Sequence, residues 1–206
     1  MSSFSALTER RFPLSNSVRI RRTLFFLSLS GLIALILYVL WNNRHEHRQD
    51  NAILAAAKRH GVDPALVKAV VWRETKFDPD AKGRAGEIGL MQIMESAALD
   101  WASAEKLFPF EHEQLFDPRT NTMAGTWYLN KLLRRYTRTD NPIPYALADY
   151  NAGRGNVLKW MKGAAATNSE VFIQQIGFPG TSNYVRAVMQ RYDHYRPEFA
   201  PSANRP

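Results

Sequence analysis

The chain has 206 residues, enough for one domain with a hydrophobic core and an appended segment. Its net charge is +8, unevenly placed: residues 1–48 hold 7 Lys and Arg against 2 Asp and Glu, and residues 49–206 hold 20 against 17. The larger part is only mildly basic and has no basic stripe interleaved with aromatics, so nucleic-acid binding is not expected. The absence of cysteine excludes a disulfide framework and a lipid-modified cysteine.

The first predicted element is a membrane-spanning helix. Residues 23–43 carry no charge, and at about 1.5 Å per residue they span roughly 30 Å, enough for a bilayer core. Tyr38 and Trp41 lie near the end of the run, where aromatic rings favour the interface. A buried core helix would seldom be apolar on every face, and a cleaved signal peptide would need small residues that 38–43 does not offer. We therefore expect an uncleaved single-pass anchor.

Arginines are concentrated on one side of this segment. Those that precede it are Arg10, Arg11, Arg19, Arg21 and Arg22. After it, Arg44 and Arg48 are mixed with acidic residues. The positive-inside rule then predicts that residues 1–22 are cytoplasmic and that residues 44–206 are exported, which in a bacterium means the periplasmic side of the inner membrane.

The exported part is predicted to be helical nearly throughout, as a domain at 51–196 between a polar linker at 44–50 and a disordered tail at 197–206. Asp63-Pro64 and Asp117-Pro118 each combine a helix cap with proline at the first helical position. Caps, prolines and glycines place helices at 51–59, 65–75, 91–101, 118–136, 145–151, 157–161, 168–176 and 182–195. No run alternates apolar and polar residues well enough to predict a strand.

Two segments stand out for their chemistry. Glu74 ends an apolar helix and is followed by 86–94, which reads Gly-Glu-Ile-Gly-Leu-Met-Gln-Ile-Met. About seventy residues further on, 146–153 reads Ala-Leu-Ala-Asp-Tyr-Asn-Ala-Gly. Taken alone, a glutamate beside Arg73 is usually a solvated surface charge. At a helix C-terminus and beside apolar neighbours, however, a carboxyl group is expected to have a raised pKa and to serve as a proton donor near neutral pH.

Together these segments resemble the soluble-lytic-transglycosylase (SLT) family, bacterial enzymes with a lysozyme-like fold that cleave the glycan strands of peptidoglycan. The resemblance covers roughly residues 52–195 and implies a mostly α, lysozyme-like domain. It implies that Glu74 protonates the bond between N-acetylmuramic acid and N-acetylglucosamine, then takes the proton of the muramyl C6 hydroxyl as a 1,6-anhydro ring closes. Water is not consumed, the substrate's N-acetyl group assists, and neither a second carboxylate nor a cofactor is required.

The resemblance also implies a set of substrate-binding residues. These are Met91, Gln92, Met94, Tyr150, Asn151 and Tyr184. Core packing remains an equal alternative for the two methionines, and a helix-capping role remains one for Asn151. The five histidines show no metal-ligand grouping, so no metal is expected.

Several positions depart from the family pattern, among them Gly83, Glu87 and Asp149. Gly83 stands where a serine can bind substrate, Glu87 replaces a small residue, and Asp149 adds a carboxylate that could face the groove. Two other functions stay open beside lytic cleavage: a hydrolytic muramidase of the same fold, and a weakly catalytic peptidoglycan-binding module of a membrane complex. In each case the expected partners are glycan strands and the inner membrane, with a cell-envelope protein complex as a further possible partner.

Overall fold

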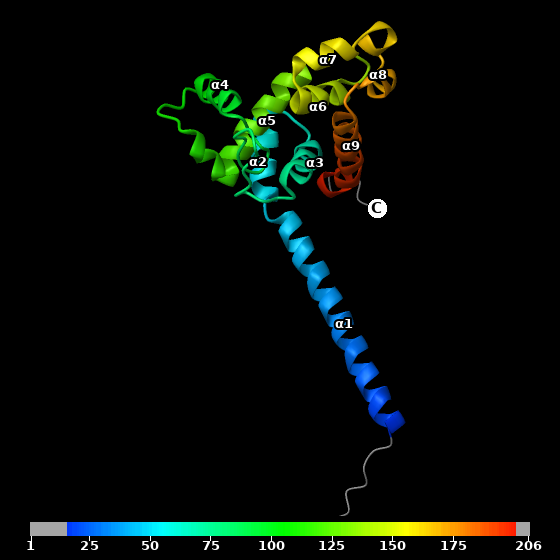
Figure 1. Cartoon of the computed structure of the whole chain (residues 1–206). Coiled ribbons are helices and arrows are strands. Elements are labelled where there is room, and N and C mark those ends of the chain that lie inside the picture. The colour runs from blue at the N-terminus through cyan, green and yellow to red at the C-terminus, as the bar shows by residue number, and fades with distance from the viewer. Residues whose placement is uncertain (1–15, 201–206) are drawn as a thin grey trace, which may run out of the picture. The chain divides into compact units, whose positions relative to one another are not determined.

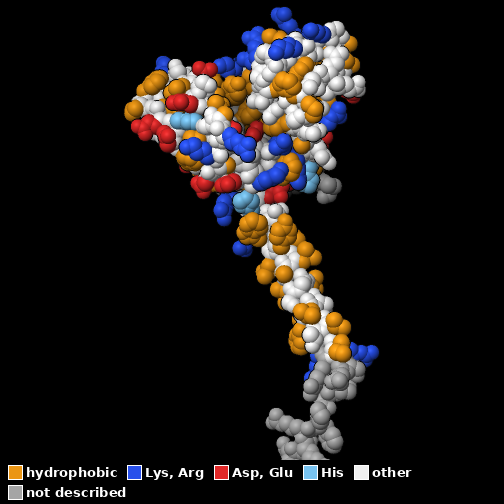
Figure 2. All heavy atoms as spheres, in the orientation of Figure 1, with side chains coloured by type: hydrophobic (Ala, Val, Ile, Leu, Met, Phe, Trp, Pro, Cys, Tyr) orange, Lys and Arg blue, Asp and Glu red, His pale blue; other side chains and the backbone are white. Residues whose placement is uncertain are grey.

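The computed structural model describes residues 16–200, which fall into two units with a boundary between His45 and Glu46. The first unit is the helix α1, Asn16–His47, up to that boundary (Figure 1). Its large hydrophobic side chains from Leu24 to Trp41 are exposed, and Figure 2 shows them along the helix. By length and composition α1 is able to cross a membrane. Residues 1–15 of the expected cytoplasmic segment lie outside the described residues.

The second unit consists of helices joined by short connections. The α-helices are α2 (Asp50–His60), α3 (Pro64–Thr75), α4 (Glu95–Glu105), α5 (Pro118–Arg135), α6 (Pro142–Ala152), α7 (Arg154–Trp160), α8 (Ser169–Gln175) and α9 (Pro179–Phe199). Two 3-10 turns, η1 (His112–Phe116) and η2 (Gly163–Ala166), complete the set. Within residues 16–200 there is no strand, only isolated bridges from Ile88 to Lys82 and Ile93. The predicted mostly α fold is therefore confirmed.

The two predicted Asp-Pro caps start helices as expected. Asp63 accepts a hydrogen bond from the Ala65 amide at 2.9 Å, and Asp117 accepts one from the Thr120 amide at 2.8 Å. Each bond satisfies an amide that has no partner within its helix, and the proline that follows needs none. Gly61 ends α2 in the left-handed conformation, with φ of 67°. Local sequence thus determines where these helices begin and end.

Helix α3 forms the centre of the core. All residues from Ala65 to Val71 are buried, which is unusual for a surface helix and explains why the segment lacks a polar face. It packs against α9 and α2, while α5 packs against α2 and α6 (Figure 1). Burial of each large apolar side chain contributes about 1.5–3 kcal/mol, so α3 is a rigid support for the residues at its C-terminal end.

Helices α6, α7 and α9 each begin three residues earlier than predicted, and three further boundaries also differ from the structure. Helix α4 begins at Glu95 rather than 91, because the preceding residues form a turn in which Gln92 has φ of 47°. The linker expected at 44–50 is helical up to His47. The tail prediction is wrong for 197–199, because α9 continues to Phe199, where Glu198 and Phe199 both contact Lys68. Residues 201–206 of that tail lie outside the described residues.

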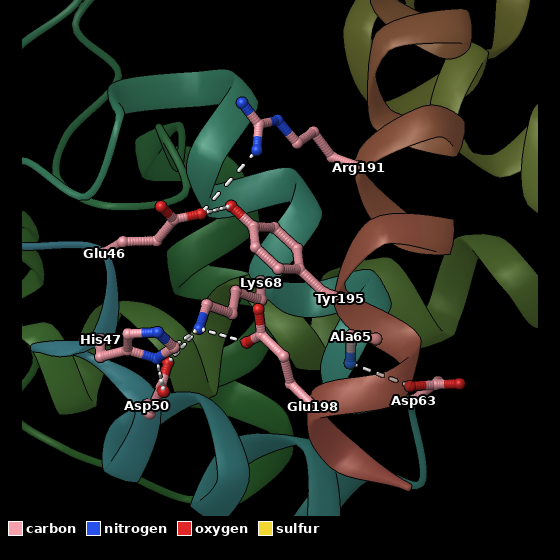
Figure 3. A network of polar contacts seen from close by, with 9 residues as sticks. All are labelled: Glu46, His47, Asp50, Asp63, Ala65, Lys68, Arg191, Tyr195 and Glu198. Atoms are coloured by element: carbon pink, nitrogen blue, oxygen red, sulfur yellow. Dashed lines mark hydrogen bonds and ion pairs between the residues drawn. The ribbon is translucent and has the colours of Figure 1, made fainter. Parts of the chain in front are cut away.

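Lys68 is a fully buried cation in the middle of α3 (Figure 3). Its Nζ lies 2.9 Å from Asp50 Oδ1 at the start of α2 and 2.9 Å from Glu198 Oε2 near the end of α9. His47 Nδ1 lies 3.0 Å away. Nearby, the Tyr195 hydroxyl donates a hydrogen bond to Glu46. This group of residues joins α2, α3, α9 and the last two residues of α1 through charge and hydrogen bonds rather than through apolar packing.

Lys68→Met is expected to lower the free energy of unfolding by about 3 kcal/mol, because two partly buried carboxylates lose their counter-charge. Lys131→Met is the matched control, since Lys131 pairs with Asp100 at the exposed surface and such pairs contribute about 0–1 kcal/mol. Chemical denaturation of the detergent-solubilised chain measures both. Equal losses for the two variants would contradict a structural role for the buried cation.

Candidate active site

Glu74 lies in the last turn of α3, which ends as Lys76 and Phe77 adopt left-handed conformations with φ of 55° and 68°. The side chain is half-buried. From α9, the Tyr184 hydroxyl donates a hydrogen bond to Glu74 Oε1 at 2.6 Å. The Arg73 guanidinium lies 5.2 Å from the centre of the Tyr184 ring. The carboxyl group is thus held from two helices.

Burial raises the pKa of Glu74 from 4.5 to about 7. The hydrogen bond from Tyr184 and the charge of Arg73 act in the opposite direction, and the charge of Glu87 raises the pKa further. The direction agrees with that expected from the sequence. A carboxyl group with such a pKa is protonated in about half of the molecules at neutral pH, as a general acid requires.

A cleft of about 210 Å³ opens beside Glu74. It is lined by Glu74, Ala85, Glu87, Gln92, Met94, Tyr150 and Asn151. The structure therefore brings four of the six predicted substrate-binding residues to the predicted acid, although up to 77 positions (151 − 74) separate them in sequence. A larger hollow of about 560 Å³, between α4 and α5, contains none of the predicted site residues.

The side chain of Asn121 in α5 holds the Gly-Leu-Met-Gln segment through hydrogen bonds to its backbone and to neighbouring backbone groups. It is fully buried, its Oδ1 accepts from the Met91 amide at 2.8 Å, and its Nδ2 donates to Ile88 O at 2.8 Å and Leu115 O at 2.9 Å. Gly89 has φ of 71°, and a Cβ there would lie 2.3 Å from Asn121 Nδ2. Sequence reasoning missed Asn121, because a single asparagine within a helix carries no motif.

Met91 packs in the core rather than in the cleft. It is fully buried, and a Cβ at Gly125 of α5 would lie 2.4 Å from its Sδ. The Met91 side chain therefore packs in the core, as the alternative interpretation predicted, and does not face a sugar. Its carbonyl oxygen accepts a hydrogen bond from the Tyr150 hydroxyl at 2.7 Å. Met94, by contrast, is 44% exposed and lines the cleft.

Gln92 lines the cleft and also holds the loop. Its Nε2 donates to Ala81 O at 3.2 Å and to Gly89 O at 3.0 Å. The side-chain amide is expected to bind a sugar; its nitrogen is engaged within the loop, which leaves its oxygen for substrate. Asn151 is exposed in the cleft, where its Oδ1 accepts from Thr181 Oγ1 at 2.8 Å. This bond links α6 to α9 rather than capping a helix.

Two residues expected at the substrate surface are placed inside the protein. Tyr184 is 1% exposed, and its hydroxyl contacts the carboxyl group of Glu74. Asp149 is 2% exposed, and its Oδ2 binds Arg135 Nη1 and accepts from the Tyr136 hydroxyl at 2.7 Å. The expectation that Asp149 adds a charge to the groove is wrong, because α6 turns this side chain towards α5. Within the described residues, no His, Asp and Glu gather closely enough to hold a metal ion.

The family model that matches this sequence is "Transglycosylase SLT domain", over residues 51–173. The chain belongs to the transglycosylase SLT family. The SLT segment begins within α2 and ends within α8, so it includes Glu74 and every residue that lines the cleft. The resemblance proposed from the two motifs is confirmed.

The relatives that match this SLT domain are named lytic murein transglycosylases. A putative soluble lytic murein transglycosylase of Haemophilus influenzae is 35% identical over 68% of this chain and 23% of its own length. The membrane-bound lytic murein transglycosylase F of Desulfosudis oleivorans is 36% identical over 50% of this chain and 21% of its own length. The chain therefore spans less than a quarter of the length of these relatives.

A solved structure shares the fold. It is an inactive glutamate-to-glutamine mutant of the lytic transglycosylase Slt from Pseudomonas aeruginosa, with a TM-score of 0.65 and 28% identity. The similarity covers 70% of this chain and 23% of the Pseudomonas chain. The lysozyme-like fold expected for the SLT domain is thereby confirmed.

Proposed function

We propose that this protein is a membrane-anchored lytic murein transglycosylase that cleaves the β-1,4 bond between N-acetylmuramic acid and N-acetylglucosamine, leaving 1,6-anhydromuramic ends. The observation that carries the proposal is the placement of Glu74. A carboxyl group with a pKa of about 7 lies in a cleft lined by Gln92, Tyr150 and Asn151. Such a group can donate a proton to a glycosidic oxygen and take one back from a hydroxyl at the same pH.

The hydrogen bond from Tyr184 assigns roles to the two oxygens of Glu74. Because Oε1 accepts from Tyr184, the transferable proton resides on Oε2. That proton passes to the glycosidic oxygen as the bond to the anomeric carbon breaks. The resulting carboxylate then takes the proton of the muramyl C6 hydroxyl while the C6 oxygen bonds to the anomeric carbon. Glu74 thereby returns to its protonated state.

Relatives support this assignment in two ways. Those that this chain resembles are named lytic murein transglycosylases, in soluble and membrane-bound forms. The Pseudomonas Slt is described as inactive when one glutamate is replaced by glutamine. A single essential glutamate in this chain is the simplest counterpart, and Glu74 is the half-buried carboxyl group of the cleft whose pKa is raised.

We further infer that residues 23–43 anchor the protein in the bacterial inner membrane, with residues 1–22 in the cytoplasm and the SLT domain in the periplasm. The exposed apolar surface of α1 and the arginines before it support this orientation. Murein strands are the substrate on that side, and a cell-envelope complex is a candidate partner. Protease added to spheroplasts is expected to remove the domain, and a domain that resists it until lysis would contradict the orientation.

Mass spectrometry of the digested products tests the proposed reaction. The full chain, solubilised in detergent, is incubated with purified peptidoglycan in H₂¹⁸O. Anhydromuramic ends without ¹⁸O support the lytic reaction. Reducing ends that carry ¹⁸O would identify a hydrolytic muramidase instead. Binding to peptidoglycan without digestion would favour a weakly catalytic binding module.

The activity is expected to fall as the pH rises through about 7, since only the protonated form of Glu74 can start the reaction. The initial rate of release of soluble fragments, measured between pH 5 and 9, should lose about tenfold for each pH unit on the alkaline side. A rate that stays constant up to pH 9 would contradict Glu74 as the acid with this pKa.

A further inference from the structure

The loop that leads from α3 to the Gly-Leu-Met-Gln segment folds back on itself. The Gly83 amide donates to Glu87 O at 2.8 Å, and Lys82 and Ile88 form the next bridge. Gly86, with φ of 95°, makes the turn between them. Gly83 and Glu87 are therefore paired across a tight turn at the edge of the cleft.

The side chain of Glu87 occupies the place of the missing side chain at position 83. A Cβ on Gly83 would lie 2.0 Å from Glu87 Cδ and 2.2 Å from both Cγ and Oε1. The other oxygen, Oε2, accepts a hydrogen bond from the Ala85 amide at 2.9 Å. The carboxyl group is thus folded over the loop, half-buried, and held by a backbone amide.

This carboxyl group shares the cleft with Glu74. The groups that face Glu74 come from several elements: Arg73 from α3, Glu87 from the loop, Tyr184 from α9 and Tyr150 from α6. Burial raises the pKa of both tyrosines well above 10, so they stay neutral in the working range. Among the charged groups acting on Glu74, Arg73 favours its ionised form and Glu87 opposes it.

We propose that Glu87 is a positioning residue for Glu74: its carboxylate, folded over Gly83 and tied to the Ala85 amide, places a fixed negative charge in the cleft, and glycine at position 83 makes room for it. The inference rests on the proposed function, because it concerns the same acid. It adds a second acidic residue that does not transfer a proton but adds to the effect of burial in favouring the protonated form of Glu74. It also gives Gly83 a role that depends on Glu87 and not on the backbone.

The pH profile of glycan digestion tests the proposal, using the full chain in detergent. Glu87→Gln keeps the shape and removes the charge, so the alkaline limb should move to lower pH by about half a unit, the size of a partly screened interaction between two carboxylates. Glu113→Gln removes an exposed charge outside the cleft and should leave the limb in place. A limb that Glu87→Gln does not move would overturn the proposal.

A double-mutant cycle tests the pairing with Gly83. Gly83 has no positive φ, so alanine is compatible with its backbone, and the three atoms nearest to the added Cβ all belong to the flexible side chain of Glu87. Gly83→Ala should therefore displace the carboxylate and move the limb, whereas it should have no further effect in a Glu87→Ala background. An equal shift in both backgrounds would refute the pairing, and thermal unfolding confirms that each variant is folded.

These outcomes are separate from failure of the proposed function. If the wild-type chain does not digest glycan, or if digestion does not need Glu74, the proposed function fails. If digestion needs Glu74 and the Glu87 and Gly83 variants keep the wild-type profile, only the positioning role fails.

Discussion

Glu74→Gln is expected to reduce the release of soluble fragments from purified peptidoglycan by about 10³-fold or more. Positioned proton transfer contributes about 10²–10⁴-fold to a rate, and here the same side chain acts twice. Glutamine keeps the size of the side chain and can still accept from Tyr184 through its oxygen, but it has no acidic proton. The comparison is the initial rate of each variant at pH 6.

Glu170→Gln, an exposed carboxylate at the start of α8, is the matched control and should digest at the wild-type rate. If Glu74→Gln also digests at that rate, Glu74 is not the acid. Binding of both variants to insoluble peptidoglycan should be similar, since the substitution removes a proton donor and leaves the lining of the cleft unchanged.

Glu74→Gln is also expected to change the thermal stability of the protein in a pH-dependent way. The pKa of Glu74 is about 7 in the folded protein, and we take its ordinary value of 4.5 for the unfolded chain. The folded protein therefore binds the proton more tightly than the unfolded chain does. The contribution of Glu74 to stability is therefore fully present below pH 4.5 and is lost as the pH rises towards 7. Glu74→Gln should raise the midpoint of thermal unfolding at pH 8 more than at pH 5. The opposite order would contradict the raised pKa.

Asn121→Ala is expected to lower the free energy of unfolding by about 3 kcal/mol, because three buried backbone groups lose their partner. It should also reduce glycan digestion, since these bonds hold the turn that places Gln92 and Met94 in the cleft. Asn130→Ala is the control: Asn130 donates one bond, to His60 O at 2.7 Å, and its removal should cost about 1 kcal/mol.

Urea denaturation followed by circular dichroism compares the two asparagine variants. Digestion assays at a temperature where both are folded then separate loss of the loop from loss of the whole domain. Equal stabilities, or an Asn121→Ala enzyme with the wild-type rate, would show that Asn121 does not support the cleft.

The features that the sequence predicted best are those that depend on residues close together in the chain. The Asp-Pro pairs placed the starts of α3 and α5, because caps act over one turn of helix. The position of Glu74 after an apolar stripe also gave the correct direction of its pKa shift, since burial of that end follows from burial of the helix. These inferences needed no knowledge of contacts between distant segments.

The structure departs from what local sequence indicates where distant segments meet. Residues 91–94 have helical propensity, but Asn121, about thirty positions later, holds them in a turn. Asp149 was expected in the groove, yet its binding to Arg135 and Tyr136 could not be read from periodicity. The bond from Tyr184 to Glu74 spans 110 positions, and the resemblance alone indicated a substrate contact for that tyrosine. Tertiary contacts decide each of these roles.

The short stretch between the apolar run and the domain limits how far the enzyme can extend from the bilayer. Only residues 44 and 45 separate the uncharged segment from the second unit, and because α1 continues through them they add only about 3 Å. A domain of this size is roughly 40 Å across. If 23–43 is the anchor, the enzyme is therefore expected to reach only those strands that come within about 45 Å of the bilayer surface. Inserting a Gly-Ser spacer after Asn43 would extend that range without altering the cleft.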